Sequence, residues 1–140
     1  MSDTIDIMHR LSPSARMLGF RILKADPATG ALEVGFLGQP EFANGEGNIQ
    51  GGMLTAMLDD AMGPCVLYRS KGEVTSTSVD LVTRFLRPTP VGPVTVKSRI
   101  AKWGRRIIFL EGTLYDKDGR ETVRATSTAL VLPGAQASAG

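Results

Sequence analysis

Two adjacent carboxylates, Asp59 and Asp60, interrupt an apolar segment of this 140-residue chain. A glycine pair, Gly51 and Gly52, stands at the start of that segment. Carboxylates are rarely buried without a partner or a purpose, and aspartate is a poor residue for the interior of a helix. Two glycines at a helix start let a ligand approach the unpaired N–H groups of the first turn closely. An acid within an apolar helix, preceded by an anion-receptive helix start, indicates a hydrolytic site.

The bulk composition is that of an ordinary globular protein, with 42% apolar and 21% charged residues. A chain of this length fits one domain, which we expect to cover residues 1–140. The formal net charge of +2 gives no argument for a nucleic-acid partner. Residues 1–12 lack the apolar run of a secretory signal, and no run approaches the roughly 18 apolar residues of a membrane span. We therefore expect a cytoplasmic protein that binds neither nucleic acid nor membrane.

The scarcity of histidine and cysteine excludes several kinds of site. His9 and Cys65 are the only residues of their types. They cannot build a zinc site of the usual His/Cys kind, so we expect no metal and no cofactor. A Ser-His-Asp triad would need His9, which lies in a short amphipathic segment. Cys65 stands among apolar residues, which predicts a packed core thiol rather than a nucleophile.

Two helices are predicted from apolar periodicity. The first covers about residues 5–18, with an alternative start at which Ser12 caps a turn beginning at Pro13. The second runs from Gly51 to about Arg69 and is apolar on nearly every face, which is typical of a helix wrapped by other elements. The Gly-Pro pair at positions 63–64 should bend or interrupt this second helix.

The other periodic segments are predicted strands, at residues 20–25, 31–37, 75–87, 94–102, 105–115 and 121–132. Their short connections predict antiparallel neighbours, because parallel strands need long crossovers. The small, polar residues 133–140 are expected to be a disordered tail. The predicted fold is α+β, with a curved antiparallel sheet of five to six strands wrapped around one long central helix.

This order of elements, together with one motif, resembles the hotdog-fold acyl-CoA thioesterases of the phenylacetate-degradation (PaaI-like) type over about residues 15–132. The motif begins with Asn44 and continues with Gln50-Gly51-Gly52, where the family usually has His-Gly-Gly. Asp59 then stands where these enzymes carry their acidic catalytic residue. A weaker match is Ser78, at the start of the next strand, where relatives often have a hydroxyl near the reacting water.

The resemblance implies hydrolysis of an acyl or aryl-acyl thioester of CoA. The N–H of Gly51, at the positive end of the helix dipole, is the expected donor to the carbonyl oxygen. Asn44 supports that carbonyl or its loop, and Asp59 acts as general base or as nucleophile. In relatives the site lies between two subunits, so we expect a homodimer or homotetramer in which the acid of one subunit faces the loop of the other.

The expected substrate-binding residues are Gly52, Asp60, Arg84, Arg105 and Arg106. The three arginines belong to a local basic group that also contains Arg87, Lys97, Arg99 and Lys102. Each of these residues also has a structural interpretation. Asp59 and Asp60 point about 100° apart on a helix, so one of them has a structural role. Asn44 is also a common turn residue, Ser78 an ordinary strand residue, and the arginines can simply be solvated.

Gln50 departs from the family pattern because an amide cannot carry a proton at neutral pH. Any acid–base step that histidine performs in relatives is therefore absent here. The alternative to an active thioesterase is a non-catalytic or weakly catalytic protein that binds acyl-CoA. Dehydratases and hydratases of the same fold are disfavoured, because they rely on a histidine paired with an acid.

Overall fold

The computed structural model describes residues 12–133, which form the helices α2 (Pro13–Leu18), α3 (Gly51–Met62) and α4 (Pro64–Ser70), the 3-10 turn η1 (Pro40–Phe42), and the strands β1 (Arg21–Ala25), β2 (Leu32–Gly38), β3 (Val74–Phe85), β4 (Gly92–Trp103), β5 (Ile107–Tyr115) and β6 (Glu121–Pro133). The part of the first predicted helix before Ser12 and the predicted tail after residue 133 lie outside the described residues.

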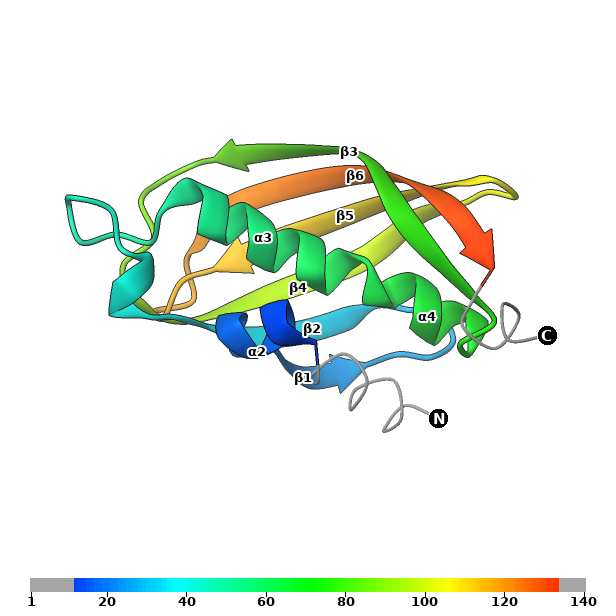
Figure 1. Cartoon of the computed structure of the whole chain (residues 1–140), viewed down its shortest axis with the longest axis horizontal. Helices are drawn as coiled ribbons and strands as arrows, with labels where there is room; N and C mark the ends of the chain where they lie inside the picture. The colour runs from blue at the N-terminus through cyan, green and yellow to red at the C-terminus, as the bar shows by residue number, and fades with distance from the viewer. Residues whose placement is uncertain (1–11, 134–140) are drawn as a thin grey trace.

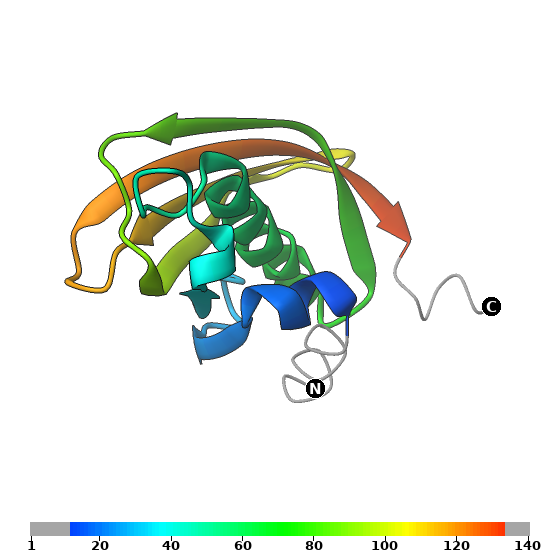
Figure 2. The same cartoon turned by 60° about the vertical axis from the view of Figure 1, so that its left-hand side comes forward.

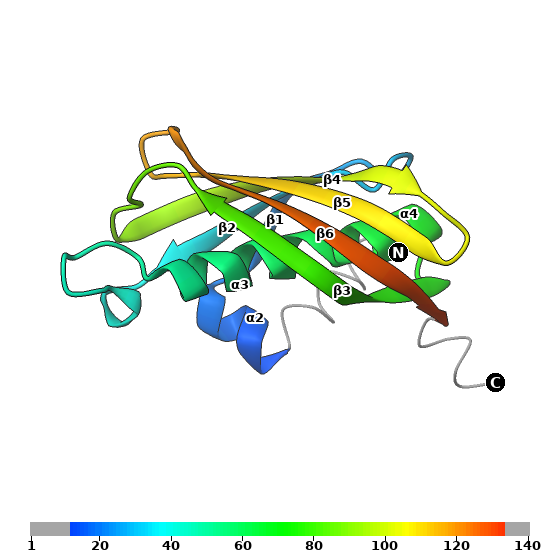
Figure 3. The ribbon, with the colours of Figure 1, turned by 90° about the horizontal axis from the view of Figure 1, so that it is seen from above.

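The strands form one antiparallel sheet in the order β1-β2-β4-β5-β6-β3. This sheet curves around α3 and α4, which lie along its concave face (Figure 1 and Figure 2). The predicted α+β hotdog fold is confirmed, with six strands in the sheet. Strand β3 ends the sheet at one edge, and β1 ends it at the other (Figure 3).

The helices begin and end where short-range chemistry requires. Ser12 caps α2, because its hydroxyl oxygen accepts a hydrogen bond from the Ala15 N–H at 3.1 Å, and Pro13 follows as the first helical residue. The long predicted helix is two helices, which are divided at Gly63. Pro64 has no N–H to continue the hydrogen-bond ladder of α3, so it begins α4 instead.

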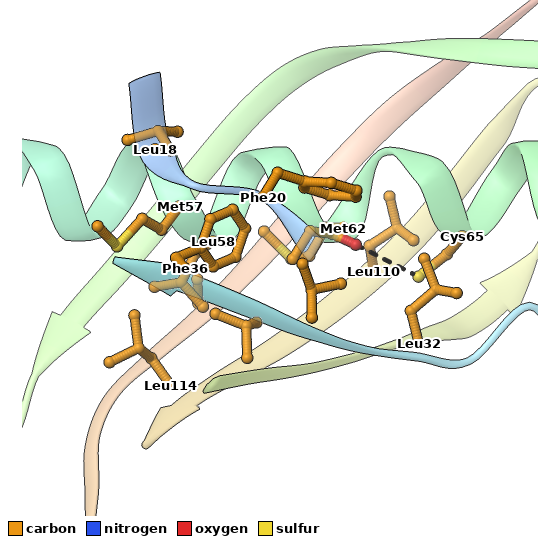
Figure 4. Packing of buried hydrophobic residues seen from close by; sticks show 14 of the residues in the cluster. Leu18, Phe20, Leu32, Phe36, Met57, Leu58, Met62, Cys65, Leu110 and Leu114 are labelled. Carbon is orange, nitrogen blue, oxygen red and sulfur yellow. Dashed lines mark hydrogen bonds between the residues drawn. The ribbon is translucent and has the colours of Figure 1, made fainter. Parts of the chain in front are cut away.

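The core lies between the concave face of the sheet and α3. Met57, Leu58 and Met62 project from α3 toward side chains of β2 and β5, as Figure 4 shows. Cys65, at the start of α4, is 0% exposed, with its sulfur 3.3 Å from the Ser98 hydroxyl oxygen. Burial raises the pKa of the Cys65 thiol to about 11, so this residue is the core thiol that the sequence predicts.

One face of α3 stays open, although the sheet curves around the helix as predicted. Its buried residues are Leu54, Met57, Leu58, Ala61 and Met62, whereas Gly52 and Asp59 are exposed. The reason is that one curved sheet covers only one side of a helix. Within the described residues, no helix is long and apolar enough to cross a membrane.

Candidate active site

Asp59 on α3 meets Ser78 on β3. The Ser78 hydroxyl donates a hydrogen bond to Asp59 Oδ1 over 3.1 Å. Both side chains line a cavity of about 430 Å³, whose other polar walls are Asp60, Thr75, Ser76, Thr77 and Ser127. A hydroxyl donor on one carboxylate oxygen fixes the orientation of the group and leaves the other oxygen available to water or substrate.

The surroundings of Asp59 are more polar than its apolar flanks in the sequence suggest. Its side chain is exposed within one chain, and the hydroxyl-bearing start of β3 faces it. Asp60 is half-buried and lines the same cavity. Asp59 is therefore an exposed carboxylate with a hydroxyl partner at the wall of this cavity.

The start of α3 carries backbone donors, as the sequence predicts for this position. Within residues 12–133, the N–H groups of Gly51 and Gly52 meet no protein acceptor, as expected for the first turn of a helix. Gln50 is the N-cap, and its Oε1 accepts from the Met53 N–H at 3.2 Å. The Gln50 N–H donates to the Phe42 carbonyl at 2.8 Å, which fixes the approach of the loop to the helix.

Gly51 has a steric role as well as an electrostatic one. The Phe85 ring lies against it, so that a Cβ at position 51 would stand 3.1 Å from Phe85 Cζ. The two residues line a second cavity of about 440 Å³, together with Asn44, Leu54 and Arg87. Arg87 belongs to the basic group that the sequence pointed to, and it is the member that lines this cavity. The sequence did not single out Phe85, for which the available signal was its position at the end of a strand, just before the Pro88 turn.

Asn44 holds the shape of the loop before α3. Its Oδ1 accepts from the N–H groups of Glu46 at 2.9 Å and Asn48 at 3.1 Å. Such a side chain closes a turn by replacing a backbone acceptor. Asn44 therefore has the turn role that the sequence left open, and it also lines the Gly51 cavity.

The two groups expected to act on one carbonyl lie in different cavities. Gly51 and Asp59 are eight positions apart on α3, which corresponds to about 12 Å along the axis of a helix. A donor to the carbonyl oxygen and a base at the carbonyl carbon must each come within about 3 Å of the same group. The cavities around Gly51 and Asp59 have no lining residue in common.

The predicted cationic residues do not reach either cavity in one chain. Arg84 on β3 is exposed, and so are Arg105 and Arg106 in the connection between β4 and β5. None of these three lines the cavity of Gly51 or that of Asp59. Among the described residues, no group of His, Cys, Asp and Glu side chains could hold a metal ion.

Comparison with known proteins identifies the family. Residues 46–123 match the family model of the thioesterase superfamily, and the chain belongs to this superfamily. The match contains the Gly51 helix start, Asp59 and Ser78. The resemblance to hotdog thioesterases of the phenylacetate-degradation type is confirmed by the Ralstonia eutropha structure described next.

A Ralstonia eutropha protein related to phenylacetic acid degradation, a presumed thioesterase, is 32% identical in sequence to this chain. The two structures superpose with a TM-score of 0.81 over 90% of this chain and 98% of the Ralstonia chain. A hypothetical thioesterase from Streptococcus pneumoniae, solved with coenzyme A, is 21% identical, with a TM-score of 0.73, over 82% and 87% of the two chains. A presumed esterase of Thermoplasma volcanium is 30% identical over 80 residues, which are 57% of this chain and 60% of that relative.

The capping geometry of Gln50 leads to a first prediction. Replacing Gln50 by alanine should reduce kcat by about 10- to 100-fold, because it removes an orienting hydrogen bond but no proton-transfer group. The pH–rate profile should show no histidine-like ionisation near about pH 6.5, because an amide at position 50 exchanges no proton. Initial rates measured across pH check both parts.

The matched control for Gln50 is Gln50→Ser, since serine also caps helices but does not extend as far as glutamine. Wild-type kcat in Gln50→Ser would mean that Gln50 contributes only as the N-cap of α3. A loss in Gln50→Ala as large as that in Asp59→Asn would instead make the Gln50 side chain a principal catalytic group.

Proposed function

We propose that this protein is an acyl-CoA thioesterase that hydrolyses an acyl or aryl-acyl thioester to the free acid and CoA. The observation that carries the proposal is the exposed Asp59 carboxylate, held by the Ser78 hydroxyl at 3.1 Å beside a cavity. Membership of the thioesterase superfamily supports the same reaction class. The pneumococcal structure with coenzyme A favours CoA as the thiol component.

The proposed reaction uses three kinds of group. Asp59 removes a proton from water as the water oxygen attacks the carbonyl carbon, or attacks that carbon itself. The carbonyl oxygen becomes negatively charged and accepts from the N–H of Gly51, where the helix dipole favours an anion. The C–S bond then breaks, and the CoA thiolate leaves and takes up a proton. Where Asp59 itself is the nucleophile, water then hydrolyses the acyl–Asp59 anhydride, which releases the free acid and restores the carboxylate. Asn44 and Gln50 hold the loop that presents the Gly51 N–H.

The proposed site forms between two subunits, with Gly51 from one chain and Asp59 from its partner. The separation of about 12 Å along one helix excludes a direct role for both groups of the same chain at one carbonyl. Strand β3 offers an interface, because it is an edge strand with exposed apolar side chains at Val79, Val82 and Phe85. Gly52, Asp60, Arg84, Arg105 and Arg106 are retained as proposed substrate contacts in that assembly.

The proposed activity is tested with acyl-CoAs of short, medium, long and aromatic acyl groups, with the released CoA measured by a thiol reagent. Turnover of at least one substrate supports an enzyme. Saturable binding of acyl-CoA without turnover would instead support the alternative of a binding protein, for which the replacement of the family histidine by Gln50 is the argument.

Sharing of the site between subunits leads to a second prediction. Asp59→Asn and Gly51→Pro subunits, each nearly inactive alone, should form mixed dimers with up to about half of the wild-type activity. One of the two sites in each mixed dimer then contains an intact Asp59 and an intact Gly51 N–H. Co-expression with two different affinity tags isolates the mixed species for the rate measurement.

The control for this experiment is a mixture of two Asp59→Asn subunits carrying the same two tags, which should remain inactive. Light scattering of the wild type should give a multiple of the 14.9 kDa chain mass. A mass of one chain at micromolar concentration, or a mixed species no more active than its parents, would contradict the shared site.

A further inference from the structure

Strand β3 contains one extra residue next to the candidate active site. Ser78 is paired with Ala129 of β6, and Asp80 is paired with the adjacent Thr128, so Val79 between them has no partner. This arrangement is a β-bulge. Val79 is accordingly 62% exposed, whereas Ala129 is 1% exposed on the helix side of the sheet.

The bulge changes which residues of β3 face the helix. In an uninterrupted strand, residues an odd number of positions apart lie on opposite faces. Ser78 and Thr83 are five positions apart, yet both contact α3. The Ser78 hydroxyl reaches Asp59 at 3.1 Å, and the hydroxyl oxygens of Thr83 and Thr55 lie 3.3 Å apart. Without the extra residue, β3 could not keep its later contact with α3 and also direct Ser78 toward Asp59.

Asp80 holds the bulge to β6 through both its side chain and its backbone. The Thr128 N–H donates to Asp80 Oδ1 at 2.9 Å, which provides a side-chain acceptor where the bulge disrupts the ladder. The Ser127 hydroxyl donates to the Asp80 carbonyl oxygen at 3.1 Å. Ser127 is itself buried and lines the cavity of Asp59. The bulge and the cavity wall are therefore joined by direct hydrogen bonds.

We propose that Asp80 is a positioning residue for the Ser78–Asp59 pair, because its carboxylate fixes the bulge that directs the Ser78 hydroxyl toward Asp59. The inference rests on the proposed function of Asp59. Asp80 pairs with Thr128 on the face of the sheet opposite to Ser78 and does not line the cavity, so it acts through Ser78 and not on the substrate.

The kinetic test compares two substitutions of Asp80. Asp80→Ala should lower kcat by about 10-fold with little change in KM, because the loss of one orienting hydrogen bond is worth about one order of magnitude in rate. Asp80→Asn keeps the Oδ1 acceptor and should retain most of the activity. The matched control is Asp26→Ala, which removes a carboxylate that accepts from the Ala28 N–H at 3.0 Å in the turn after β1, and it should leave kcat unchanged.

A double substitution tests whether Asp80 affects kcat through Ser78. In a Ser78→Ala background, Asp80→Ala should cause no further loss of kcat, because the residue that it positions is already absent. An independent 10-fold loss in that background, or an unchanged kcat in Asp80→Ala alone, would overturn the proposal. An equal loss in Asp80→Asn would also overturn it, since the acceptor is then still present.

Hydrogen exchange at the Thr128 amide tests the bulge without reference to activity. Exchange should be faster in Asp80→Ala than in the wild type and close to wild-type in Asp80→Asn. Unchanged exchange in Asp80→Ala would show that Asp80 does not hold the bulge. A wild-type protein that hydrolyses no acyl thioester would contradict the proposed function instead, and the exchange measurement would still decide whether Asp80 fixes this part of β3.

Discussion

Asp59→Asn should leave the protein folded and lower thioester hydrolysis by about 10²- to 10⁴-fold, the range expected for loss of a general base. The substitution keeps an Oδ1 atom that can accept from the Ser78 hydroxyl, so the local geometry is preserved. It removes the negative charge and the capacity to take up a proton. Steady-state rates with the best acyl-CoA, and the thermal unfolding midpoint, measure the two parts of this prediction.

The matched control is Asp60→Asn, which makes the same chemical change at the next residue. Asp60 lines the same cavity but is half-buried, and we expect a smaller loss from its substitution. Equal losses at the two positions would remove the distinction between them. A well-folded Asp59→Asn protein with full activity would eliminate Asp59 as base or nucleophile.

Much of the fold follows from local signals in the sequence. The Ser12-Pro13 start and the Gly63-Pro64 division depend on the chemistry of adjacent residues, and the structure has both where the sequence predicts them. Strand bounds differ by one or two residues at most ends, as in β4, predicted over 94–102 and observed over Gly92–Trp103. Strand ends depend on pairing with neighbours, which a periodic pattern does not contain.

The arrangement of the candidate site was less accessible to sequence reasoning. The bulge at Val79 is a property of the register between β3 and β6, which are separated by two other strands in the chain. The contact of Phe85 with Gly51 also joins distant segments. The polar surroundings of Asp59 were not evident from its apolar sequence neighbours, because they come from the hydroxyl-bearing start of β3, which is distant in the chain.

The backbone donor at Gly51 can be removed by a single substitution, because proline has no N–H. Position 51 is the first residue of α3, where proline is well tolerated, and Gln50 before it is extended, at φ −62° and ψ 138°, as a residue before proline must be. Gly51→Pro should therefore keep the helix and lower kcat by about 10²- to 10³-fold, the usual effect of losing one oxyanion donor.

Gly51→Ala separates the loss of the donor from the steric effect of a side chain. Either substitution introduces a Cβ about 3.1 Å from Phe85 Cζ, so both bring a side-chain carbon against that ring. Only proline removes the N–H. A much larger loss of kcat in Gly51→Pro than in Gly51→Ala, at similar thermal stability, is the result expected of a backbone donor to the developing oxyanion. Equal losses would mean that the contact with Phe85, and not the N–H, makes glycine necessary at this position.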